Sequence, residues 1–226
     1  MEPNCLHHNA NYWDRLYDTQ HVESHVFRPF GRIIAKDFGL TGARHERVLD
    51  YGCASGSAVL FYKEKGFDAY GVDISRENIG ACSRRMPDIA DHFAVIDAMP
   101  KEKDLYFGGE FDLILAIDSL YYYTNELLHL RLQTLHRQLK PGGIIYATMI
   151  GSGSTAYTDH STRLENGMYR VNSCVGGSEH FINITHSEDE LVEKFSMFGA
   201  RHIGFHSHRF RQDEGTVFFY TYVGQK

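Results

Sequence analysis

The sequence has little of several residue types that would each point to a particular class of protein. Its 226 residues include only four cysteines and five prolines. The cysteines are Cys5, Cys53, Cys82 and Cys174. They are far apart and form no C-x-x-C pair, so neither a zinc knuckle nor a disulfide framework is indicated. We therefore expect no bound metal ion.

An excess of positive charge and a long apolar run are also missing. The formal net charge is −6, which argues against a large nucleic-acid footprint. No apolar stretch approaches the ~20 residues that a membrane span requires. Residues 1–8 lack the charged and then apolar layout of a secretory signal. These absences favour a cytoplasmic protein that binds neither nucleic acid nor membrane.

The chain does have an ordinary globular composition, with 42% apolar and 23% charged residues. Apolar and amphipathic segments alternate along it, which indicates a parallel sheet with crossover helices. The sequence predicts strands at residues 47–51, 68–73, 92–96, 111–117 and 144–150, and helices at residues 57–65, 75–86 and 125–139. Residues 100–110 are predicted to form a loop, and residues 140–143 a turn.

The pattern changes after residue 150. Residues 151–166 are predicted to be irregular, and residues 168–173 and 179–185 to form a hairpin. Ser187 and Glu190 have the spacing of a capping box, so a helix is predicted at 187–197. Strands are then predicted at 201–208 and 216–223. Because no helix separates these two strands, they must pair antiparallel.

Fourteen histidines are spread along the chain, a high number for this length. His202, His206 and His208 alternate along the predicted strand, so they can share one face. Metal binding is one interpretation, but partly exposed strand histidines fit the pattern better.

A glycine-rich turn joins the first two predicted strands. Gly52 and Gly56 follow the first strand, a helix begins at residue 57, and the second strand ends at Asp73. Glycines allow a sharp turn over a ligand, and the first turn of a helix offers unpaired N–H groups. A carboxylate at the next strand end is placed to bind a ribose diol. These features predict a nucleoside-cofactor site.

The spacing of the glycines differs from that of a dinucleotide-binding turn. No third glycine completes G-x-G-x-x-G, and an acidic residue, Asp50, precedes Gly52. The segment resembles the first motif of class I S-adenosylmethionine-dependent methyltransferases, acidic-x-Gly-x-Gly-x-Gly. Asp50, Gly52 and Gly56 fit that motif, and Ala54 stands where its middle glycine usually is. An acidic group beside the turn suits a cationic cofactor and would repel a diphosphate.

The resemblance covers roughly residues 47–223 and implies the fold. Class I methyltransferases have a Rossmann-like α/β fold, in which a seven-stranded mixed sheet ends in an antiparallel pair. We therefore expect N-terminal lid helices in residues 1–45, at 11–19 and 30–40, and a core domain in residues 46–226. Residues 151–186 would form an insertion on the substrate side.

The resemblance also implies which residues hold S-adenosylmethionine and its product S-adenosylhomocysteine. The glycine turn would meet the methionine end, Asp73 the ribose, and the loop after the third strand the adenine. The expected cofactor-binding residues are Asp50, Gly52, Cys53, Ala54, Gly56, Asp73, Ile74, Asp97, Ala98, Ile117, Tyr12 and Trp13. Simpler interpretations are a buried packing role for Cys53 and an ordinary turn aspartate at Asp97.

The acceptor is expected to be a small molecule. The Asn/Asp-Pro-Pro-Tyr/Phe motif of enzymes that methylate amino groups of nucleic acids is absent. Many small-molecule members have a histidine where this chain has Tyr122. The candidates for a catalytic base or orienting group are Tyr122, His180 and His160, and core packing is the alternative for the tyrosines.

Other functions remain open at this point. A nicotinamide-dependent oxidoreductase, a cofactor-binding protein without turnover and a protein methyltransferase are the alternatives to a small-molecule methyltransferase. The sequence does not distinguish O-methylation from N-methylation. We expect a monomer or a homodimer.

Overall fold

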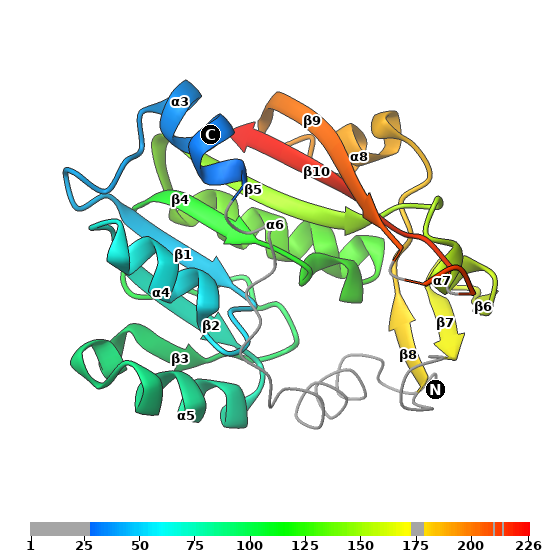
Figure 1. Ribbon diagram of the computed structural model, residues 1–226, viewed down its shortest axis with the longest axis horizontal. Coiled ribbons are helices and arrows are strands. Elements are labelled where there is room, and N and C mark those ends of the chain that lie inside the picture. Colours follow the sequence, from blue (N-terminus) through cyan, green and yellow to red (C-terminus); the bar gives the residue numbers. More distant parts are fainter. Residues whose placement is uncertain (1–27, 173–178, 210, 214) are drawn as a thin grey trace.

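A computed structural model describes residues 28–172, 179–209, 211–213 and 215–226. Its main feature is a seven-stranded sheet in the order β3-β2-β1-β4-β5-β10-β9 (Figure 1). The strands are β1 (Arg47–Tyr51), β2 (Asp68–Asp73), β3 (Phe93–Val95), β4 (Phe111–Ala116), β5 (Leu139–Ile150), β9 (Gly199–His208) and β10 (Val217–Gln225). β1 to β5 pair in parallel, and β10 pairs antiparallel with both β5 and β9. The predicted mixed sheet with a final antiparallel pair is confirmed.

Helices cover both faces of this sheet. They are η1 (Phe30–Ile34), α3 (Ala35–Phe38), α4 (Ser57–Glu64), α5 (Arg76–Arg85), η2 (Pro87–His92), η3 (Leu120–Tyr122), α6 (Asn125–Gln138), α7 (Thr155–Thr158) and α8 (Glu188–Lys194). One core lies between the sheet and η1, α4 and α5, and a second lies between the sheet and α6 and α8. Figure 1 shows α4 and α5 in front of the sheet and α6 behind it.

The helix starts follow the signals in the sequence. The side chains of Ser75 and Ser187 cap α5 and α8 by accepting the N–H groups of Asn78 and Glu190. The Glu190 carboxylate accepts the backbone N–H of His186 at 2.8 Å, which completes a variant of the predicted capping box. The ordered starts of these helices therefore come from local sequence.

Three parts of the chain differ from the prediction. The predicted turn at 140–143 is a bulge inside β5, because Leu139 pairs with Phe111 and Ile144 pairs with Leu113. The predicted helix at 30–40 ends at Phe38, and its first five residues are a π-helix. Residues 151–166 are not wholly irregular, since they contain α7 and the strand β6 (Ser161–Arg163).

The strand β6 belongs to a second, smaller sheet. It pairs antiparallel with β7 (Tyr169–Asn172), which pairs antiparallel with β8 (Glu179–Ile182). A tight turn at Gly167, which has a φ of 81°, lets residues 164 and 168 pair and so brings β6 against β7. The predicted hairpin is thus the outer part of a three-stranded sheet. Figure 1 shows this sheet beyond the carboxyl end of β5.

The predicted lid helix at 11–19 and the turn at 175–178 lie outside the described residues. Among the residues that are described, no helix has the length and apolar character needed to cross a membrane.

Candidate functional site

The glycine turn after β1 is shaped by close backbone contacts. The N–H groups of Gly52 and Cys53 both donate to the carbonyl oxygen of Val72, at 2.8 and 3.0 Å. Gly52 has a φ of 81°, and a Cβ built on it would lie 2.5 Å from the Cβ of Ser119. Gly56, with a φ of 74°, is the N-cap residue of α4. Only glycine fits at residue 52, because the loop after β4 lies directly against it.

Asp73 joins this turn to the start of α5. Its Oδ2 accepts the N–H of Ala54 at 2.9 Å, and its Oδ1 accepts the N–H of Ser75 at 2.8 Å. The helix cap itself is Ser75, so capping does not explain the buried carboxylate at Asp73. Each carboxylate oxygen has more than one lone pair, so an oxygen that accepts a backbone N–H can also accept from a ribose hydroxyl.

Asp50 is a second buried carboxylate under the turn, with 5% of its surface exposed. Burial and the neighbouring Asp73 raise the pKa of Asp50 to about 7. Two acidic groups in one desolvated place are costly, and a bound cation would relieve that cost.

The loop after β3 carries the residues expected at the adenine. Asp97 is exposed, and it forms an ion pair with Lys101 Nζ at 2.7 Å and accepts the N–H of Met99 at 3.0 Å. These bonds are typical of an aspartate in a turn. If Asp97 contacts the adenine, its carboxylate must do so in addition to these two bonds. Ala98 and Ile74 are half-buried. The residues expected around the adenine thus follow the ends of β2 and β3.

The segment after β4 closes the site from the other side. Asp118 has a φ of 53°, and its N–H donates to Thr148 Oγ1 at 2.8 Å, while that hydroxyl donates to Asp118 Oδ1 at 2.8 Å. Ile117 is half-buried against the core under α4. Ser119 Oγ is buried and has no hydrogen-bond partner among the described residues. The prediction missed Ser119, because only its contact with Gly52 identifies it.

Aromatic side chains gather beyond β4 and β5. The rings of Tyr121 and Tyr122 are 4.5 Å apart, and Tyr121 also lies 6.0 Å from Phe219. Tyr157 on α7 meets His180 on β8 edge-on at 6.0 Å. Burial and the nearby Tyr122, Asp118 and Tyr157 raise the pKa of Tyr121 well above its ordinary value. Four different elements therefore bring one aromatic cluster to the carboxyl ends of the parallel strands.

The three predicted catalytic candidates have different positions. Tyr122 and His180 both belong to the aromatic cluster, through Tyr121 and Tyr157, respectively. His160 is exposed in the turn before β6. The predicted cofactor residues Tyr12 and Trp13 lie outside the described residues.

The histidines on β9 separate into different roles. His206 stacks on Phe219 with ring centroids 5.1 Å apart, and His202 forms an ion pair with Asp37 at 3.2 Å. His206 thus extends the aromatic cluster, and its alternation with His202 and His208 was the only signal for it. Over the described ranges, no group of three or more metal-ligating side chains occurs.

The small sheet is fixed to the main sheet where its last strand returns. Asn183 N donates to the carbonyl oxygen of Tyr121 at 2.7 Å, and Thr185 N donates to that of Ile150 at 2.8 Å. Lys194, almost fully buried, donates to Asn183 Oδ1 at 2.9 Å and to Thr185 Oγ1 at 3.0 Å. These bonds hold β8 and His180 in place relative to the end of β5.

Known proteins resemble this chain in sequence. A family described as "Methyltransferase domain" matches residues 22–210. A malonyl-(acyl-carrier protein) O-methyltransferase of Enterobacter lignolyticus is 29% identical over 117 residues, which are 51% of this chain and 43% of that protein. A ubiquinone biosynthesis O-methyltransferase of Pseudomonas aeruginosa is 24% identical over 150 residues, 65% of this chain and 60% of that protein. The chain therefore matches less than two thirds of the length of these relatives.

A solved structure shares the fold over nearly the whole chain. The S-adenosylmethionine-dependent methyltransferase of Clostridium acetobutylicum superposes with a TM-score of 0.65 at 16% identity, covering 98% of this chain and 99% of that one. The sheet order and the family match agree with the resemblance found in the sequence. The chain therefore belongs to the methyltransferase domain family and has the class I methyltransferase fold.

Proposed function

We propose that the chain binds S-adenosylmethionine above β1 and β2 and transfers its methyl group to an oxygen atom of a small molecule. The observation that carries this proposal is the Asp73 carboxylate, which is buried at the end of β2 and bonded to the N–H of Ala54 in the glycine turn. A carboxylate in this place can accept both hydroxyls of a ribose.

The residues of the turn suit this cofactor. The place where Gly52 meets Ser119 leaves no space for a side chain, so glycine at residue 52 is what allows the loop after β4 to lie against the turn. The buried Ser119 hydroxyl offers a donor and an acceptor at the same place. Asp50 and Asp73 supply negative charge for the ammonium and sulfonium groups. When bound, S-adenosylmethionine supplies an electrophilic methyl group on a positively charged sulfur.

The acceptor would lie on the aromatic cluster. The insertion at 151–186 forms one wall of this region through Tyr157 and His180, and the η3 turn forms another through Tyr122. These residues would orient the acceptor and exclude water. A hydroxyl acceptor must lose its proton during the reaction, and His180 or Tyr122 would take it as general base.

O-methylation is proposed rather than N-methylation for two reasons. Two relatives of the chain are named as O-methyltransferases. In addition, a neutral amine can attack without losing its proton first, whereas a hydroxyl needs a base such as those in the cluster. A protein acceptor and a cofactor-binding role without turnover are outcomes that the test must distinguish.

Binding of S-adenosylhomocysteine, measured by titration calorimetry, tests the cofactor part. Asp73→Asn should weaken this binding at least about tenfold, because it removes charge-assisted bonds. Asp91→Asn, an exposed aspartate beyond α5, is the matched control and should bind like the wild type. Unchanged affinity in Asp73→Asn would remove Asp73 from the site. Stabilisation by a nicotinamide dinucleotide but not by S-adenosylhomocysteine would overturn the whole proposal.

The acceptor part is tested with methyl-labelled S-adenosylmethionine and fractionated metabolite extract. Label in an ether or ester of a small molecule supports O-methylation. Label in an amine or only in protein, or no transfer at all by a protein that binds the cofactor, would contradict it.

A further inference from the structure

Arg131 on α6 is the largest fully buried side chain of the described residues, with 0% of its surface exposed. A buried guanidinium is costly unless charges and hydrogen bonds surround it. Here its Nη1 pairs with Asp104 Oδ2 at 3.0 Å and also donates to the hydroxyl of Tyr106, while its Nη2 donates to the carbonyl oxygen of Asp97 at 3.1 Å. Three of its partners therefore belong to one loop, between β3 and β4.

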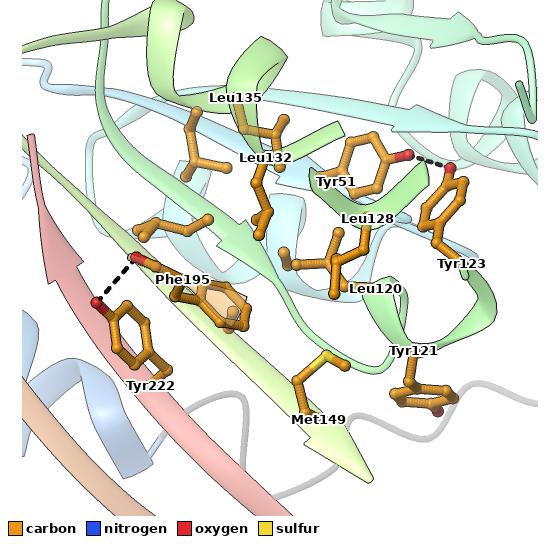
Figure 2. Packing of buried hydrophobic residues seen from close by; sticks show 14 of the residues in the cluster. Tyr51, Leu120, Tyr121, Tyr123, Leu128, Leu132, Leu135, Met149, Phe195 and Tyr222 are labelled. Atoms are coloured by element: carbon orange, nitrogen blue, oxygen red, sulfur yellow. Dashed lines mark hydrogen bonds between the residues drawn. The ribbon is translucent and has the colours of Figure 1, made fainter. Parts of the chain in front are cut away.

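Two tyrosine rings complete the surroundings of the guanidinium. Its Cζ lies 5.3 Å from the ring centre of Tyr51 and 5.7 Å from that of Tyr123, both within the range of cation–π attraction. The hydroxyls of these tyrosines are 2.6 Å apart. Figure 2 shows the two hydroxyls pointing toward each other.

The guanidinium thus joins three segments that border the proposed cofactor site. Tyr51 is the last residue of β1 and directly precedes Gly52 in the glycine turn. Tyr123 follows η3, which carries Tyr122. Asp97, whose carbonyl oxygen accepts from Arg131, begins the loop expected at the adenine. One buried charge on a helix therefore contacts both the loop after β3 and the residue that precedes the glycine turn.

We infer that Arg131 is a positioning residue, which holds the Asp97–Ala98 backbone where it recognises the adenine ring of the cofactor. This inference rests on the proposed function. Arg131 acts from beneath the loop, through the Asp97 carbonyl group and through Asp104 and Tyr106. The carboxylate of Asp97 lies on the exposed side of the loop, where it pairs with Lys101 and accepts the N–H of Met99, whereas Arg131 binds the loop from its buried side.

A lysine cannot replace this arginine. The planar guanidinium donates to separate acceptors in fixed directions and lies within cation–π distance of two rings, whereas an ammonium is a compact point charge. Arg131→Lys keeps the charge that Asp104 needs but loses part of this geometry. The loop would then be held less well, while the glycine turn and Asp73 keep their own contacts.

The test compares two ligands that differ only in the purine. S-inosylhomocysteine has a carbonyl oxygen in place of the adenine amino group of S-adenosylhomocysteine, and its N1 carries a hydrogen, so that both positions change between donor and acceptor. Wild type should bind the adenosyl ligand at least about tenfold more tightly, because the amino donor and the N1 acceptor are both lost and polar groups of the protein are left unpaired. In Arg131→Lys this ratio should fall to about threefold or less, with most of the loss in the affinity for the adenosyl ligand.

Leu132→Val, a buried neighbour on the same helix, is the control for general loosening of α6. It should lower the melting temperature and leave the ratio unchanged. If Arg131→Lys does not fold, Tyr106→Phe and Asp104→Asn remove single contacts of the guanidinium and should lower the ratio in the same direction.

The possible failures are distinct. A folded Arg131→Lys, or both single-contact variants, with the wild-type ratio would overturn the positioning role of Arg131. An equal fall of the ratio in Leu132→Val would also overturn it, since any loosening of the helix would then suffice. A wild-type protein that binds neither ligand would instead refute the proposed function.

Discussion

Replacing Asp50 with asparagine should remove a pH dependence that the buried carboxylate gives to the protein. Burial and the charge of Asp73 raise the pKa of Asp50 to about 7. Tyr62 and Cys53 also interact with Asp50, and both stay neutral because their pKa values are raised. Burial is the main cause for Tyr62. The main cause for Cys53 is its hydrogen bond with Cys82. Asp50 is therefore the group that titrates near neutral pH under the glycine turn.

The sign of the stability effect follows from the direction of the pKa shift. The folded protein binds the proton more tightly than the unfolded chain, so stability is full below pH 4 and is lost as the pH rises through 7. Between pH 6 and pH 8, this one group lowers the free energy of unfolding of the ligand-free protein by about 1.4 kcal/mol. Asp50→Asn lacks this loss and should be more stable than the wild type at pH 8.

Ligand affinity should change in the opposite direction. The ammonium group of the ligand prefers the ionised carboxylate of Asp50, and at pH 6 only about one protein molecule in ten carries that carboxylate in its ionised form. The apparent affinity for S-adenosylhomocysteine should therefore rise about tenfold from pH 6 to pH 8 in the wild type. In Asp50→Asn the affinity should be weaker at pH 8 and nearly independent of pH.

Titration calorimetry at pH 6, 7 and 8 measures the affinities, and thermal melts of the ligand-free proteins measure the stabilities. A wild-type affinity that does not change with pH would refute the assignment of a cation partner to Asp50. So would an Asp50→Asn protein that keeps the full tenfold rise. The thermal melts distinguish a loss of affinity in Asp50→Asn from misfolding of the variant, because a folded Asp50→Asn protein is expected to have a higher melting temperature than the wild type at pH 8.

Two further substitutions test other parts of the site. Gly52→Ala places a methyl group 2.5 Å from the Cβ of Ser119, so we expect cofactor binding to be lost and the free energy of unfolding to fall by about 2 kcal/mol. The double variant Gly52→Ala/Ser119→Gly should partly recover the melting temperature. An unchanged melting temperature for Gly52→Ala would show that the loop after β4 can move aside. His180→Gln should slow methyl transfer at least about 100-fold without changing the affinity for S-adenosylhomocysteine. The exposed control His160→Gln should change neither the rate nor the affinity. Equal rates in the two variants would exclude His180 as the base.

Much of the fold could be predicted because its signals are local. The apolar run of β4 indicates a strand buried on both faces, and Ser187 with Glu190 marks the start of α8 within one helical turn. The final antiparallel pair follows from the direct connection between β9 and β10, whereas the seven-stranded mixed sheet was implied by the resemblance to class I methyltransferases. The strand β6 was missed because three polar residues, Ser161–Arg163, show no apolar alternation and form a strand only through pairing with β7.

The site was predicted less completely, because several of its features depend on contacts between distant parts of the chain. Gly52 was recognised from the sequence as part of the turn. The sequence did not show that the close contact with Ser119 excludes any larger residue at that position. Arg131 lies in a helix of leucines, where a charged residue normally faces solvent, and nothing local shows that Asp104 and the tyrosines surround it. Position in a motif can be read from sequence, whereas the partner that fixes a side chain depends on tertiary packing.

The charge of the site also bears on the oxidoreductase alternative. A dinucleotide places a pyrophosphate against the glycine turn, and that group carries two negative charges. In this chain the turn lies on Asp50 and Asp73, both buried, and burial together with the charge of Asp73 already raises the pKa of Asp50. A pyrophosphate there would add to the repulsion, whereas a ligand with an ammonium and a sulfonium removes it. The same pair of carboxylates that costs the empty protein stability therefore selects the sign of the charge on its ligand.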